Sequence, residues 1–305
     1  MGRSGLRVSA IGLGTTAFGA QAQGDEAVRV LQHAIGLGLT FIDTAVTYAQ
    51  GRSEELLGRA LEGRRHEVVI ATKAGLSMTG DRTYRNLSRS HLIRCLELSL
   101  TRLRTDHVDL FMAHRPDANT PIDETLEAMD RMVQEGKVRY IGGSNYAAWE
   151  MARAIGRSER AGLVPWIAAE NRWNVVEGLS DPHLAPASSA LGFGIIAYQP
   201  LMSGTLTGKY ALGKPLEGSR EADLRSRGDI TDEAIAAADR LKVWARARGH
   251  TTGEAATAWL LSQPECTSVI IGARSIEQLE ANVKAADWRL TEAERDEVTR
   301  IAAGP

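Results

Sequence analysis

The chain has 305 residues and a formal net charge of −2, with 36 lysines and arginines against 38 aspartates and glutamates. This balance leaves no basic surplus for nucleic acid or a membrane surface, and no segment approaches the ~20 unbroken apolar residues of a membrane span, so we expect neither partner. The two cysteines, Cys95 and Cys266, have no second Cys or His at metal-ligand spacing, which predicts no metal site and two reduced, buried thiols in a cytoplasmic protein.

Short apolar runs alternate with amphipathic helices along nearly the whole chain, a pattern typical of parallel βα units. Eight strands are predicted, from 11–14 to 268–271. Helices are predicted over 25–37, 53–61, 88–103, from 120 onward, and over 151–155, 182–191 and 276–286. Two extra helices, 232–248 and 253–261, precede the eighth strand, and 292–301 forms a tail helix. We therefore predict an α/β fold, a (β/α)8 TIM barrel, as one domain over residues 1–305.

The segment 202–230 breaks this alternation. It has neither helical nor strand periodicity, and structureless loops of this length in compact domains are usually lids or binding loops. Its basic residues are Lys209, Lys214, Arg220, Arg225 and Arg227. We predict an anion-binding flap beside the seventh strand, with an ordinary solvated loop as the alternative.

Polar residues follow the predicted strands where each of them ends. They are Asp43, Lys73, His114, Ser144 with Asn145, Glu170 with Asn171, Tyr198, and Arg274. In a parallel barrel all carboxyl ends of strands open on one face, where such barrels keep their chemistry. The pattern predicts that these residues meet around one pocket.

Two motifs resemble those of other dehydrogenase folds. Residues 12–17 match the G-x-G-x-x-A dinucleotide fingerprint, but that fingerprint must open a helix directly, and here the next helix is predicted only from about Asp25. Tyr210 and Lys214 have Tyr-x-x-x-Lys spacing, but glycine and proline interrupt the helix they would need. Neither motif supports a Rossmann fold.

Asp43, Tyr48, Lys73 and His114 form a chemically consistent set. A phenol is a poor proton donor at neutral pH, but a nearby ammonium lowers its pKa, and a carboxylate keeps that ammonium charged and oriented. A histidine can position a carbonyl oxygen. Each residue alone also fits a structural role, but four together at one barrel mouth favour acid–base chemistry.

The sequence resembles the aldo-keto reductases over nearly its whole length. The fragments that carry the resemblance are GLRVSAIGLGT at 5–15, FIDTA at 41–45 with Tyr48, GRSEELLG at 51–58, VIATK at 69–73, DLFMAHRPD at 109–117, GKVRYIGGSN at 136–145, and IIGAR at 270–274 with Gln278 and Asn282. The resemblance implies a TIM barrel that binds NADPH, NADP(H) being the expected cofactor, in an extended conformation. It also implies a catalytic tetrad of Asp43, Tyr48, Lys73 and His114.

The same resemblance implies the cofactor contacts. Ser144, Asn145 and Glu170 would hold the nicotinamide amide, Tyr198 would stack on the ring, and the 201–209 loop would hold the pyrophosphate. Arg274, Gln278 and Asn282 would bind the 2′-phosphate and adenine, which agrees with an arginine beside a helix that Ser275 can cap. The full set of expected cofactor residues is Gly14, Thr15, Thr16, Asp43, Ser144, Asn145, Glu170, Tyr198, Gln199, Leu201, Ser203, Gly204, Lys209, Gly272, Arg274, Gln278 and Asn282.

The chain departs from the family pattern at two places. Glu170 stands where similar members usually have glutamine, and Trp173 often corresponds to tyrosine. An ionised Glu170 only accepts hydrogen bonds and would favour the cationic oxidised nicotinamide, whereas a protonated Glu170 could also donate. The N-terminus has little of the family's usual hairpin before Gly2, which predicts a less well sealed closed end.

The function these features predict is NADPH-dependent reduction of an aldehyde or ketone, with Tyr48 as the general acid. The expected partner is a small carbonyl substrate. Its pocket would be lined by Phe18, Tyr48, Tyr84, His114, Arg115, Trp149 and Trp173. A sugar or sugar-nucleotide ketoreductase is an alternative because the basic loop could meet a substrate diphosphate. A nucleotide-sensing subunit similar to potassium-channel β-subunits is less favoured, since no appended docking segment is visible. Neither the individual substrate nor the oligomeric state follows from the sequence.

Overall fold

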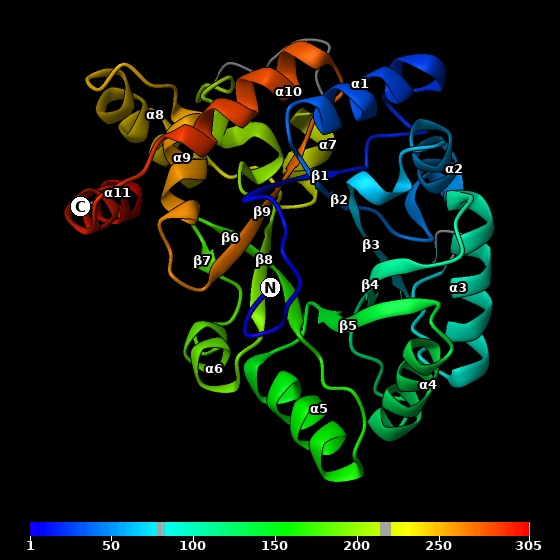
Figure 1. Ribbon diagram of the computed structural model, residues 1–305. Coiled ribbons are helices and arrows are strands. Elements are labelled where there is room, and N and C mark those ends of the chain that lie inside the picture. The colour runs from blue at the N-terminus through cyan, green and yellow to red at the C-terminus, as the bar shows by residue number, and fades with distance from the viewer. Residues whose placement is uncertain (78–80, 82, 214–220, 305) are drawn as a thin grey trace.

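A computed structural model describes residues 1–77, 81, 83–213 and 221–304, which leaves Lys214 and Arg220 of the expected flap outside the described residues. Eight parallel strands close into a barrel in the order β5-β4-β3-β2-β1-β9-β8-β6, and β5 pairs with β6 to complete it (Figure 1). The barrel strands are β1 (Ile11–Gly14), β2 (Phe41–Asp43), β3 (Val69–Ala74), β4 (Val108–Ala113), β5 (Val138–Ser144), β6 (Ala168–Asn174), β8 (Gly194–Tyr198) and β9 (Cys266–Gly272). The predicted TIM barrel is confirmed.

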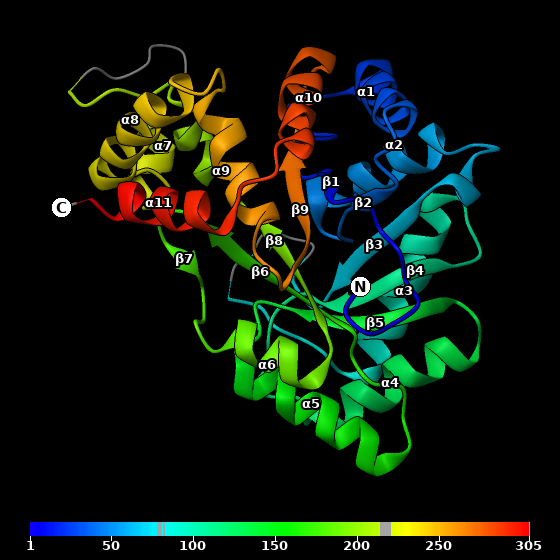
Figure 2. The ribbon, with the colours of Figure 1, turned by 60° about the vertical axis from the view of Figure 1, so that its left-hand side comes forward.

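Helices surround the barrel, as the periodicity predicts (Figure 2). They are α1 (Gly24–Gly36), α2 (Arg52–Ala60), α3 (Arg89–Leu103), α4 (Ile122–Gln134), α5 (Ala148–Ala161), α6 (Leu184–Leu191), α7 (Glu221–Ser226), α8 (Asp232–Arg246), α9 (Thr252–Leu261), α10 (Ile276–Val283) and α11 (Glu292–Ala303). The extra helices before the last strand are α8 and α9, and α11 is the tail helix. Among the described residues, no helix is long and apolar enough to cross a membrane.

The barrel interior is a separate apolar cluster from the shell between strands and helices. It includes Phe41, Leu110, Met112 and Ile196 from three strands, each with almost no exposed surface. Met1 and Leu6 belong to this interior cluster, and the backbone at Arg3 bonds to Gly192, just before β8 begins. These N-terminal residues therefore cover the closed end of the barrel. The short N-terminus predicts a less well sealed closed end, and the structure differs from that prediction.

The described parts of the segment 202–230, residues 202–213 and 221–230, are not structureless as the sequence predicts. It contains a 3₁₀ turn, η3 (Met202–Thr207), and the short helix α7. Arg225 pairs with Glu221 and Asp232, and Arg227 pairs with Asp223, so these two arginines are engaged by carboxylates. Salt bridges at i,i+4 spacing stabilise α7, a helix too short for periodicity to reveal.

The dinucleotide fingerprint is not used as one. After β1 the chain forms turns, and α1 begins only at Gly24, so residues 12–17 do not open a helix directly, as predicted. Both cysteines are free; Cys95 is buried as predicted, but Cys266 is only partly buried.

Candidate functional site

The site is built around a buried ion pair between neighbouring strands. Asp43 ends β2 and pairs in register with Ala71 of β3, so Lys73, two residues further, projects on the same side into the barrel. The Lys73 ammonium donates to the Asp43 carboxylate and, at 3.0 Å, to the carbonyl oxygen of Thr44. Lys73 has no exposed surface. A cation so deep in a barrel is expensive unless it is paired, and Asp43 supplies that pairing.

Tyr48 and His114 lie over this pair. Tyr48 begins η1 (Tyr48–Gly51), and the Lys73 Nζ atom is 5.4 Å from the centre of its ring. The His114 ring meets the Tyr48 ring edge-on, with centroids 6.0 Å apart. Ala49 and Gln50 take left-handed backbone angles, φ 47° and 59°, which turn the chain sharply beneath Tyr48. The four residues proposed from the sequence are thus brought together.

Protonation in this cluster follows from burial and charge. Burial raises the pKa of Tyr48 to about 12, an effect that the Lys73 charge only partly offsets. The pKa of Lys73 is raised, because Asp43 and Glu170 outweigh the effect of burial. Burial and then the Lys73 charge hold the pKa of His114 well below its usual range. At neutral pH the cluster has a phenol, an ammonium and a neutral imidazole.

Glu170 adds a second carboxyl group to Lys73. It lies on β6, in register with Ser144 of β5, and its Oε2 atom is 3.3 Å from Lys73 Nζ. The residue is 3% exposed, and Oε2 has no hydrogen-bond partner among the described residues. Burial, followed by the neighbouring Asp43 charge, raises the pKa of Glu170 to about 8. The sequence predicts that Glu170 lies at the barrel mouth, but it does not predict the contact between Glu170 and Lys73.

Ser144, Asn145 and Tyr198 form one hydrogen-bonded network beside the cluster. The Tyr198 hydroxyl donates to Asn145 at 2.6 Å, and the Asn145 amide donates to the carbonyl of His114 at 3.0 Å. The Ser144 hydroxyl donates to the Glu170 carbonyl. Asn145 takes a left-handed φ of 63°, a conformation often stored at functional sites. The network fixes the carboxyl ends of β5, β6 and β8 relative to one another.

The loop after β8 is strained and has unsatisfied polar atoms. Gln199, Met202 and Ser203 all have positive φ angles, of 55°, 45° and 55°. Gln199 Oε1 and Thr205 Oγ1 are buried without hydrogen-bond partners in the described part of the chain. Such orphaned atoms are rare in native interiors and need an explanation. The sequence analysis did not include Thr205 among the cofactor residues. Its hydroxyl group, within the loop expected to hold the pyrophosphate, is the feature that could have indicated it.

Lys209 lies close to this loop. A Cβ added to Gly204 would come within 2.7 Å of Lys209 Nζ, so glycine at 204 leaves room for the ammonium. Lys209 also lies over the Tyr210 ring, 4.9 Å from its centre. Within residues 1–77, 81, 83–213 and 221–304 no carboxylate pairs with it. Of the three basic flap residues that the structure describes, Arg225 and Arg227 pair with carboxylates and Lys209 does not.

The region after β9 has an exposed arginine at a helix start. Ser275 caps α10 as predicted, because its hydroxyl accepts a hydrogen bond from the backbone N–H of Gln278. The side-chain oxygen of Gln278 accepts a hydrogen bond from the backbone N–H of Arg274. The Asn282 amide donates to the Gly272 carbonyl at 3.2 Å. The Arg274 side chain is exposed and has no ion pair with a described residue. This is the geometry that favours a phosphate group.

Four expected cofactor residues lie at or just after the ends of β1 and β9. Thr15 is completely buried, and its hydroxyl donates to the Asp43 carbonyl at 3.0 Å. Gly14 and Gly272 are paired across β1 and β9. Thr16 is exposed and interacts with the Tyr48 hydroxyl. Thr15 therefore positions β2, whereas Thr16 remains accessible at the mouth.

The expected substrate residues do not share one environment. Phe18 has no exposed surface, and Trp173 is 5% exposed and packs edge-on against Trp259. Trp149 lies on α5 and is 64% exposed, and Arg115 directly follows His114 on the surface. Tyr84 is 37% exposed. Phe18 and Trp173 are packed in the interior here, while the other three are accessible.

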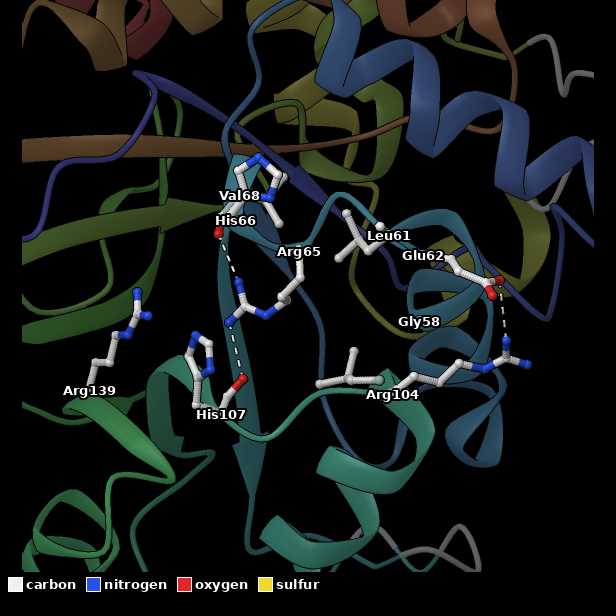
Figure 3. Close-up of a pocket in the computed structure, with 11 residues that line it drawn as sticks. Gly58, Leu61, Glu62, Arg65, His66, Val68, Arg104, His107 and Arg139 are labelled. Atoms are coloured by element: carbon white, nitrogen blue, oxygen red, sulfur yellow. Dashed lines mark hydrogen bonds and ion pairs between the residues drawn. The ribbon is translucent and has the colours of Figure 1, made fainter.

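A cavity of about 530 Å³ lies at the opposite end of the barrel (Figure 3). It is lined by residues that precede or begin β3, β4 and β5, among them Arg65, His107 and Arg139. Arg65 donates to the Val68 and His107 carbonyls, and both Arg65 and Arg139 pair with buried Asp109. Arg65 and Arg139 are thus held by other groups of the protein. We therefore assign them a structural role at this end of the barrel rather than a role in binding or catalysis.

Comparison with known proteins agrees with this geometry. A model of the aldo/keto reductase family matches residues 10–303. The chain is 36% identical to the uncharacterized oxidoreductase YrpG of Bacillus subtilis, over 95% of this chain and 91% of the relative. It is 32% identical to the aldo-keto reductase YhdN of the same organism, over 98% and 91% of the two chains. It is 37% identical to a probable voltage-gated potassium channel subunit beta of Oryza sativa, over 94% and 90%. The chain belongs to the aldo/keto reductase family.

Proposed function

We propose that the protein reduces an aldehyde or ketone to an alcohol with NADPH. The observation that carries this proposal is the buried Asp43–Lys73 pair placed under Tyr48, with a neutral His114 ring beside the same phenol. A buried ammonium directed at a phenol has no evident role in packing, and strongly perturbed groups of this kind cluster at catalytic sites.

Each residue has a distinct task in this proposal. Bound NADPH supplies the hydride that adds to the carbonyl carbon. Tyr48 donates its proton to the carbonyl oxygen, which becomes the alcohol hydroxyl. Lys73 stabilises the phenolate that Tyr48 leaves behind, and Asp43 keeps Lys73 charged and oriented. His114, neutral at working pH, positions the carbonyl oxygen through a ring nitrogen.

The residues at the barrel mouth fit an extended dinucleotide phosphate. Gln199 Oε1 and Thr205 Oγ1 are buried and have no hydrogen-bond partner within the described structure, which is expected of atoms that bind a ligand. Lys209 supplies a cation where the pyrophosphate would lie, and Arg274 supplies one beside the α10 N-terminus for a 2′-phosphate. Neither Lys209 nor Arg274 has a carboxylate partner among the described residues, and Arg274 is the cation that would favour NADPH over NADH, because only NADPH has a 2′-phosphate.

A second candidate is a nucleotide-binding regulatory subunit. It is favoured by one observation, the 37% identity to a protein described as a probable potassium channel subunit beta. The cluster around Tyr48 supplies the proton donor that turnover requires, so we place the reductase first.

A panel of carbonyl compounds that includes aliphatic and aromatic aldehydes, ketones and sugars tests the proposal. NADPH consumption is followed for each compound with the wild type and with Tyr48→Phe, and binding of NADPH and NADH is titrated separately. Tyr48-dependent NADPH consumption with at least one compound supports a reductase. NADPH binding without turnover of any compound supports the regulatory candidate, and no binding of either dinucleotide rejects both.

A further inference from the structure

The Lys73 ammonium is shared by two carboxyl groups rather than one. Asp43 Oδ1 bonds to it directly, and Glu170 Oε2 lies 3.3 Å from it on the β6 side. The two carboxyl groups also interact with each other. With both ionised, the group would have a net charge of −1 in a site where all three side chains are buried. One proton on the pair makes it neutral, and buried groups at this spacing share a proton for that reason.

Glu170 is the member of the pair that can hold this proton. The Asp43 carboxylate accepts a hydrogen bond directly from Lys73, which favours its ionised form. Glu170 Oε2 lies farther from the ammonium, at 3.3 Å, and has no other hydrogen-bond partner among the described residues, so its charge is stabilised less than that of Asp43. This difference favours the shared proton on Glu170, beside the Lys73 ammonium.

We propose that Glu170 is a positioning residue for the proton donor: its shared proton keeps the Asp43–Lys73–Glu170 group neutral, and loss of that proton weakens Tyr48 as an acid. The inference rests on the proposed reductase activity. An added negative charge behind Lys73 offsets the ammonium charge that Tyr48 experiences and raises the pKa of the phenol. Reduction should then slow as Glu170 ionises.

Several titratable groups face Glu170. They are Asp43 from β2, Lys73 from β3, Tyr48 from η1 and Tyr198 from β8. The pKa of Glu170 is raised to about 8, whereas that of Tyr48 is raised to about 12 and those of Lys73 and Tyr198 are also raised. Burial also raises the pKa of Asp43, which shares the proton with Glu170, so this carboxyl pair is the part of the described group that titrates between neutral pH and about pH 9.

The pH profile of carbonyl reduction in wild type and Glu170→Gln tests the inference. For the wild type, kcat should fall about tenfold between about pH 6.5 and 9, because that span ionises about nine-tenths of a group with a pKa near 8. Glutamine has the same shape and no titrating proton, so the profile of Glu170→Gln should stay flat over this range. Each profile is normalised to its own maximum, so that a uniform loss of activity does not enter the comparison.

Glu177→Gln is the matched control. Glu177 lies just beyond the same strand, is partly exposed and pairs with Arg172. Removing its carboxylate should leave the wild-type profile unchanged. Identical profiles for wild type and Glu170→Gln would overturn the inference, as would a flat profile in Glu177→Gln.

A second readout does not depend on turnover. Infrared difference spectra of the ligand-free protein between about pH 6.5 and 9 should show loss of a protonated carboxyl band in wild type but not in Glu170→Gln. If the protein reduces no carbonyl compound, this band still reports whether Glu170 holds the proton. Absence of the band in wild type would overturn the inference even if the protein proves to be a reductase.

Discussion

Replacing Lys73 with methionine separates the chemical role of the ammonium from its structural role. Methionine keeps much of the side-chain volume and removes the charge. Lys73 Nζ lies 5.4 Å from the centre of the Tyr48 ring. A unit charge at that distance is worth about 3 kcal/mol at an effective dielectric of ~20, which corresponds to a roughly hundredfold change in acidity. We expect kcat for carbonyl reduction in Lys73→Met to fall by about 10² or more.

The same change leaves two carboxyl groups buried without a counter-ion. Breaking a buried pair by removing one partner costs about 3–5 kcal/mol when the remaining charge stays ionised. In Lys73→Met both Asp43 and Glu170 should be protonated in the folded protein, so their folded-state pKa values lie above the unfolded ones. The unfolded state then binds fewer protons as pH rises above about 4, and the stability of this variant should fall with increasing pH.

Urea unfolding at about pH 6 and 8, followed by circular dichroism, measures this effect, and steady-state NADPH consumption measures the kinetic one. The double variant Lys73→Met/Asp43→Asn is the control, because it removes a stranded carboxyl without restoring the ammonium. It should regain stability but not activity. Near wild-type kcat in Lys73→Met, or stability that rises with pH, would refute the role assigned to the ion pair.

Two further predictions concern the phosphate site and the packing of the shell. Arg274→Ala should weaken the binding of NADPH by about 1.5–3 kcal/mol and the binding of NADH much less, because a charge-assisted bond to the 2′-phosphate is lost. Equal losses of affinity for both cofactors in titrations would contradict this assignment. Gly58→Ala in α2 should destabilise the protein by about 1–3 kcal/mol, because the new Cβ would lie 2.4 Å from the Arg102 carbonyl oxygen. Gly156→Ala in α5, with no atom within 4 Å, should stabilise it by about 0.5–1 kcal/mol. Similar urea midpoints for both alanine variants would contradict the packing argument.

The barrel and the meeting of distant polar residues could be predicted because both depend on simple periodicities. Strand and helix repeats gave the βα alternation, and the common direction of parallel strands brought Asp43, Lys73 and His114 to one face. The bounds of α1 and α2 lie within a residue or so of those expected. These features require no knowledge of loop conformation.

The contacts that depend on three-dimensional closure could not be predicted. Glu170 is far from Lys73 in the sequence and not on an adjacent strand, so their 3.3 Å contact follows only from side chains converging inside a closed barrel. Helix α7 was missed because six residues show no usable period. The interior positions of Phe18 and Trp173 depend on how the loops fold over the barrel, which sequence patterns do not encode.

Tyr48→Phe tests the central claim most directly. Phenylalanine keeps the ring against His114 and removes only the hydroxyl that would protonate the substrate. With the best carbonyl compound, kcat should fall by about 10²–10⁴, the usual contribution of general acid catalysis, while the NADPH dissociation constant stays within a few-fold of wild type. Near wild-type turnover in Tyr48→Phe would contradict the account.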